Sequence, residues 1–268
     1  MKRFSDKMLD LLLLKFIIAV LVVLALSIIS EKINPKMAGF ISGLPTGTAI
    51  TLFFFGLELG PEFASESATF NLSGMVALQF FIYVYYKTSE VFEKYTIIIS
   101  SLFSIAAYIL VISLLYIANV GLIGSVLLSI ISIPAFIHLF RKIEDTKIKR
   151  KIELDSKTLV FRAIIASTII LFVINLAGIV GPKWAGLFSA FPTTLFPLIL
   201  ITHYTYEKKY VHTIIKNVPY GILSVVMYSI GVFYLYPLIG VYAGTFVSYL
   251  LVILYIFSYF SCLAKPSR

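Results

Sequence analysis

One thirteen-residue pattern occurs twice in this chain, and the duplication constrains the fold more than any other feature of the sequence. Residues 35–47 read PKMAGFISGLPTG and residues 182–194 read PKWAGLFSAFPTT, at an offset of 147 positions without a gap. Seven of the thirteen positions are identical, and the same offset matches Gly74 to Gly221. This agreement predicts two copies of one ancestral segment.

Long apolar runs recur from one end of the chain to the other. Of 268 residues, 60% are hydrophobic and 13% are charged, whereas a soluble domain carries about 25% charged residues. Runs of about twenty apolar residues predict membrane-spanning helices, so we expect an all-α integral membrane protein with about nine of them. The first run is too long for the core of a signal peptide, and we keep it as a helix. The expected helices are residues 8–30, 37–58, 66–86, 95–117, 119–140, 159–180, 183–204, 213–235 and 238–263.

The polar stretch at residues 141–158 is the natural boundary between two halves. It separates a first membrane repeat, residues 1–140 with five helices, from a second, residues 159–268 with four. Because five crossings precede the second copy, that copy must run through the bilayer in the opposite sense. The sequence therefore predicts two inverted-topology repeats, an arrangement common among secondary transporters.

Lysine and arginine are distributed unequally between the predicted loops. With the N-terminus outside and the C-terminus inside, fifteen basic residues lie in cytoplasmic segments and four lie outside. This agrees with the positive-inside rule and predicts an N-out, C-in protein of a prokaryotic plasma membrane. The net charge of +9 thus sets topology, and we expect the lipid bilayer as a partner rather than nucleic acid.

Each copy of the repeated pattern begins with proline and carries a second proline further on. Proline is well tolerated at the first position of a helix. Pro45 and Pro192 lie deeper, where proline breaks or kinks a helix and frees backbone carbonyls. With Thr46 and Thr193 beside them, these breaks predict a polar substrate-binding or gating site near the middle of the membrane.

Other positions of the repeat have two readings that the sequence leaves open. Gly39, Ser42, Gly186 and Ser189 could contribute to the same site, or could simply let helices approach closely. The remaining candidates are basic residues at matching positions of the two halves. Lys36 and Lys183, at helix N-termini, could guide an anion or lie at the membrane interface. Lys15 and Arg162, on the first helix of each half, could act in transport or extend their charged ends to the interface.

The sequence offers little for catalysis. It contains no HExxH or GxSxG pattern and a single cysteine, Cys262, so we expect no enzyme, no metal site and no cofactor. Polar residues within the apolar runs, such as Asn71 and Asn175, are candidates to line a pore because polar groups in lipid face protein or water.

These features together predict a secondary transporter of a small solute, with an anion among the alternatives. A non-transporting assembly or regulatory protein of the membrane is the second reading, and an intramembrane enzyme the third. The solute or ion and the choice between monomer and homo-oligomer stay open at this stage.

The pattern P-K-x-A-G-x-x-x-x-x-P-T, followed by apolar residues and Glu58, resembles the small GlpM-like membrane proteins. The resemblance covers about fifty residues in each half, which would make this chain a doubled version. The second copy departs from the pattern, with Phe191 before its proline and Thr205 in place of the acid. The resemblance implies a multi-pass inner-membrane protein and does not indicate a substrate.

Overall fold

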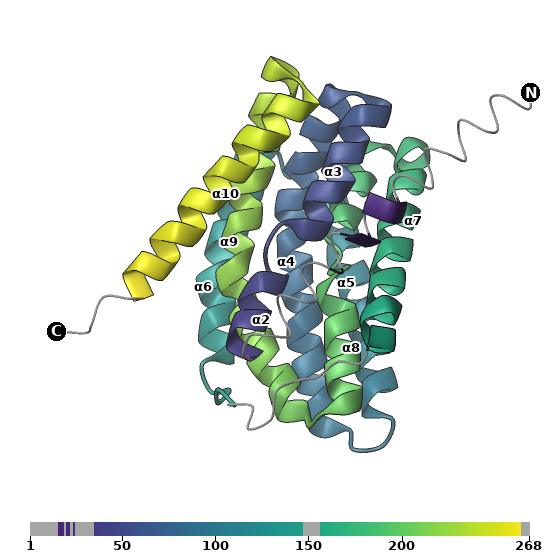
Figure 1. Cartoon of the computed structure of the whole chain (residues 1–268), viewed down its shortest axis with the longest axis vertical. Coiled ribbons are helices and arrows are strands. Elements are labelled where there is room, and N and C mark those ends of the chain that lie inside the picture. Colours follow the sequence, from purple (N-terminus) through teal and green to yellow (C-terminus); the bar gives the residue numbers. More distant parts are fainter. Residues whose placement is uncertain (1–15, 19, 22–23, 25–34, 147–155, 264–268) are drawn as a thin grey trace, which may run out of the picture.

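The computed structural model describes residues 16–18, 20, 21, 24, 35–146 and 156–263, and in this part the chain is helical without strands (Figure 1). Seven helical stretches among these residues are long and apolar enough to cross a membrane. The described chain is therefore all-α and multi-pass, as predicted. Most of the predicted helix at 8–30 lies outside the described residues. The helices are α2 (Pro35–Ser42), α3 (Thr46–Leu59), α4 (Pro61–Val91), α5 (Thr96–Ala118), α6 (Leu122–Phe140), α7 (Ser156–Ser189), α8 (Leu195–Thr205), α9 (Lys208–Ile239) and α10 (Val241–Leu263).

Each copy of the repeated pattern forms two short helices separated by a break. α2 ends at Ser42 and α3 begins at Thr46, with Pro45 between them. In the second copy α7 ends at Ser189 and α8 begins at Leu195. The predicted helices 37–58 and 183–204 are thus both interrupted where proline cannot donate to the preceding turn.

The two breaks have the same backbone hydrogen bonds at an offset of 147 residues. In each, an amide before the proline, the amide after it, and an amide four residues beyond the proline find local carbonyl acceptors. These bonds satisfy part of the backbone that the breaks free. They are Leu44→Ile41, Thr46→Leu44 and Ala49→Pro45 in the first copy, and Phe191→Phe188, Thr193→Phe191 and Phe196→Pro192 in the second.

The kink in α7 lies at a boundary that the sequence analysis predicts. Non-helical backbone at Gly181 divides α7 into two helical parts, between the predicted helices 159–180 and 183–204. Gly181 has φ 79°, a left-handed conformation that glycine adopts without a steric penalty. Pro182 follows at the start of the second straight part, the position where proline is well tolerated.

Helices α4 and α9 form the centre of the bundle and run antiparallel to each other. α4 contacts α3, α5, α6, α7 and α9, and α9 also contacts α2, α8 and α10. Near one end Ser65 donates to the Phe233 carbonyl at 2.7 Å, and near the other Lys208 lies 3.4 Å from Glu90. The outer helices α5, α6 and α10 leave many large apolar side chains exposed, as helices facing lipid do.

Helix α2 packs closely against α9 and runs parallel to it. A Cβ atom on Gly39 would clash with the carbonyl oxygen of Ile214, and one on Gly43 would meet Val218 and Gly221. Contacts therefore advance along both helices in the same direction. Small residues permit this backbone approach.

The second straight part of α7 packs on α4 in the corresponding way. A Cβ atom on Gly186 would clash with the carbonyl oxygen of Ser67, and one on Gly74 would meet Ala190. Each of these contacts has a counterpart between α2 and α9, in which both residue numbers differ by 147. Since this part of α7 is parallel to α4, and α4 is antiparallel to α9, the two broken segments run in opposite directions.

Candidate functional site

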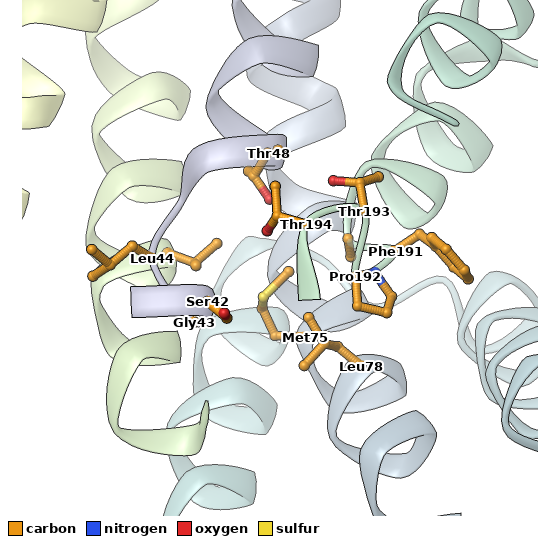
Figure 2. Close-up of a pocket in the computed structure, with 13 residues that line it drawn as sticks. Ser42, Gly43, Leu44, Thr48, Met75, Leu78, Phe191, Pro192, Thr193 and Thr194 are labelled. Carbon is orange, nitrogen blue, oxygen red and sulfur yellow. The ribbon is translucent and has the colours of Figure 1, made fainter. Parts of the chain in front are cut away.

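A small cavity lies where the two breaks meet (Figure 2). Residues 42–44, 47 and 48 line it from the α2–α3 break, and residues 190–194 from the α7–α8 break. Met75 and Leu78 of α4 and Val225 of α9 close its remaining walls. Its volume is about 20 Å³, enough for about one water molecule.

Threonine hydroxyls gather at the contact between the breaks. The Oγ1 atoms of Thr46 and Thr194 lie 3.4 Å apart, and Thr48 Oγ1 donates to the Ser189 carbonyl at 3.3 Å. Figure 2 shows Thr48, Thr193 and Thr194 among the side chains that line the cavity. Two segments that are about 147 residues apart in the sequence therefore share one polar site.

Asn71 of α4 joins the two broken segments by hydrogen bonds. Its side chain is fully buried. Its Nδ2 donates to Ser189 Oγ at 2.7 Å and to Thr48 Oγ1 at 3.5 Å, while its Oδ1 accepts from Ser229 Oγ at 2.9 Å. One amide thus links α4 to α3, α7 and α9, and its buried polar atoms are satisfied as the interior of a bundle requires.

The broken helices bring four helix ends to the cavity. α3 and α8 begin there, and α2 and α7 end there. Helix N-termini carry partial positive charge and C-termini partial negative charge, so the site has both signs without an ionised group. Among the residues that line it, none is charged.

The predicted site residues of the repeat divide into two groups in the structure. Ser42, Pro192 and Thr193 line the cavity, and Pro45 and Thr46 belong to the same break. Gly39 and Gly186 lie four residues before the lining residues Gly43 and Ala190, whereas Ser189 directly precedes Ala190 and its carbonyl accepts from Thr48. Gly39 and Gly186 are buried against α9 and α4 respectively, and the Ser189 hydroxyl accepts a hydrogen bond from Asn71.

The basic candidates lie away from the cavity. Lys36 is exposed near the start of α2. The ammonium of Lys183 lies 4.2 Å from the ring centroid of Tyr116 and 5.7 Å from that of Phe70, a cation–π arrangement. Lys15 lies outside the described residues, as does the side chain of Arg162, so their pairing is not tested.

Sequence reasoning did not single out the apolar walls of the cavity. Met75, Leu78 and Val225 belong to apolar runs and carry no chemical signal of their own. One signal was present, because Leu78 and Val225 are 147 positions apart, the offset that relates the two breaks. In the described part of the chain, His, Cys, Asp and Glu side chains do not gather in groups of three that could hold a metal ion.

Comparison with protein-family models, with curated proteins and with solved structures finds no match to this chain. The resemblance to GlpM-like proteins therefore stays a prediction.

Proposed function

We propose that the protein is a secondary transporter of a small polar solute, with its binding site at the cavity between the two breaks. The observation that carries the proposal is the meeting of two proline-broken membrane segments, running in opposite directions, at one hydroxyl-lined cavity. Discontinuous helices leave backbone groups unpaired at membrane depth, which is tolerated around a buried or hydrated site. Transporters use such helices to bind solutes and coupling ions.

We further propose that the two halves are inverted repeats, with nine spans arranged as five and four and an N-out, C-in topology in a prokaryotic plasma membrane. The offset of 147 residues relates the sequence pattern, the hydrogen bonds of the breaks and the glycine contacts. The α4–α5 loop, the segment after α6 and the start of α9 lie at one end of the bundle. These are segments that the charge distribution assigns to the cytoplasm.

The small cavity volume indicates a closed form of the proposed transporter. Space for about one water molecule does not admit a larger solute. Binding then requires the two breaks to separate, which opens the contact between Thr46 and Thr194 and the hydrogen bond from Thr48 to the Ser189 carbonyl. Inverted repeats supply the two nearly equivalent conformations that such a cycle needs.

The charge of the solute is not determined by a side chain of the cavity. An anion would be favoured by the N-termini of α3 and α8, and a cation by the C-termini of α2 and α7. Lys36 and Lys183 stand at the outer ends of the two broken segments. Anions are therefore the first solutes to test.

The experiment is flux into proteoliposomes, measured with a panel of small anions, cations and neutral solutes. Pro45→Ala and Pro192→Ala allow the helix to continue through the break. Each removes the cost of proline within a helix, which is on the order of 3 kcal/mol. We expect each to lower flux by about tenfold or more while membrane insertion is retained. Pro134→Ala, at an exposed position within α6, is the matched control and should transport normally.

The alternative of a non-transporting assembly protein has a distinct outcome. If no solute moves or raises the melting temperature, and both proline variants lose folded protein equally, the breaks serve packing alone. A ligand that binds the folded state stabilises it, so stabilisation by a solute would speak against that alternative.

A further inference from the structure

A second and larger cavity lies at one end of the bundle. It has a volume of about 270 Å³ and is formed by the end of α4, the start of α9 and residues 142–146, which follow α6. Its lining is rich in ionisable groups. They include Tyr86, Glu90, Lys142, Glu144, Lys209 and His212.

One wall of this cavity is built from a buried polar network between α4 and α9. The His212 side chain is 8% exposed, and its Nδ1 lies 3.5 Å from the Glu90 carboxylate. Its Nε2 lies 2.8 Å from Ser89 Oγ, and Lys208 Nζ lies 3.4 Å from the same Glu90 carboxylate. The negative charge of Glu90 is therefore already balanced by Lys208 of α9.

The other wall is held against α9 by three contacts. Lys216 Nζ lies 3.2 Å from Asp145 and donates to the Ile143 carbonyl at 2.7 Å. The Thr146 amide donates to Thr213 Oγ1 at 2.9 Å. Residues 142–146 thus form a defined surface of the cavity.

The cavity retains an excess of positive charge after these pairs are formed. Lys142 and Lys209 face only Glu144 among the remaining ionised lining groups, and neither has an ion pair within the described residues. α9 begins at Lys208, so its first-turn N–H groups add positive potential. A compact anion with several acceptor oxygens matches this environment.

The position of the cavity limits where such an anion could come from. Tyr83 and Tyr86, with Lys87 lying over both rings, mark the end of α4 as the membrane–water interface. Lipid phosphates lie at this depth, and basic pockets between helices on the cytoplasmic side bind anionic headgroups. At the opposite end of the bundle the positions equivalent to Lys209 and His212 are Glu62 and Ser65, so the basic cavity belongs to one end.

We propose that this cavity binds a phosphate group, carried either by an anionic lipid headgroup or by a free phosphate compound. Lys142 and Lys209 supply the attraction, and Glu144 weakens it. The site is separate from the cavity between the breaks, and the proposal does not depend on transport.

The test uses the purified full-length protein in neutral detergent, with thermal unfolding followed by Trp184 fluorescence. Short-chain phosphatidylglycerol, short-chain phosphatidylcholine and inorganic phosphate are titrated separately. We expect phosphatidylglycerol or phosphate to raise the melting temperature, with phosphatidylcholine clearly weaker. Stabilisation by the lipid alone identifies a headgroup site, and equal stabilisation by phosphate identifies a site for the free anion.

Three variants test whether any stabilisation arises from binding in this cavity. Lys142→Gln with Lys209→Gln should weaken apparent affinity by about fivefold for each lysine removed, and Glu144→Gln should strengthen it. Lys94→Gln removes an exposed lysine of the α4–α5 loop, at the same end but outside the cavity, and should bind like the wild type. The proposal is overturned if no ligand stabilises the protein, or if the double variant and Lys94→Gln respond alike.

Discussion

Asn71 is the residue through which the parts of the central site are joined. Its amide reaches Thr48 of α3, Ser189 of α7 and Ser229 of α9 from a fully buried position on α4. A buried amide that loses its partners costs far more than a satisfied one contributes, because its desolvation is then uncompensated. The position consequently tolerates polarity only while all three partners remain in place.

Asn71→Ala removes this amide and leaves the Ser189 and Ser229 hydroxyls without it. We expect a loss of about 1–3 kcal/mol in the free energy of unfolding, measured by denaturant or thermal unfolding in detergent. Asn175→Ala is the matched control, because Asn175 is exposed and donates only within its own helix, to Leu171. Similar losses in the two variants would contradict a special role for the buried amide.

Residue chemistry in the sequence identified candidates but not their partners. Asn71 stood out because it is polar within an apolar run, yet Ser229 is 158 positions away and no local pattern connects them. In the same way, Lys183 was recognisable as a lysine at a helix start. That its ammonium lies over Tyr116 depends on how α5 packs against α7, which the sequence does not reveal.

At the scale of elements, the two breaks are the features that the sequence predicted best. Proline has a direct local effect on a helix, so Pro45 and Pro192 predicted the interruptions without tertiary information. The predicted boundary between residues 180 and 183 also agrees with the structure, because non-helical backbone at Gly181 separates the two straight parts of α7. The close approach of the breaks was a hypothesis from symmetry, and it is the packing of α2 on α9 and of α7 on α4 that brings them together.

A disulfide between the breaks tests whether they must separate for transport. Thr46 and Thr194 have side-chain oxygens 3.4 Å apart, so Thr46→Cys with Thr194→Cys in a Cys262→Ser background should cross-link on mild oxidation. We expect oxidation to abolish flux and a reductant to restore it, measured in the same proteoliposomes. Each single cysteine variant controls for oxidation itself, and full transport by the cross-linked protein would contradict the proposed opening.

At the scale of the whole molecule, the arrangement around α4 and α9 determines which ends of the broken segments face each other. Composition and apolar runs predicted an all-α multi-pass protein, and the described helices agree with that. Which helix occupies the centre was not predicted, although α4 is less apolar than α5 and carries Asn71 and Gln79. The structure separates them by burial, because α4 is enclosed by neighbours while α5 turns one side outward.

The opposite orientation of the two segments makes a prediction about topology. Lys36→Cys and Lys183→Cys, each in a Cys262→Ser background, should react with a membrane-impermeant thiol reagent from opposite sides. We expect residue 36 to label only in inside-out vesicles and residue 183 only in intact cells, scored by a mass shift. Labelling of both from the same side would rule out the inverted arrangement.

Two sets of hydrogen bonds join the broken segments of the two halves. Thr46 contacts Thr194 directly, and Asn71 donates to both Thr48 and Ser189. Each broken segment is therefore part of the surface on which the other packs. The opening that we propose at one break would also remove contacts of the other.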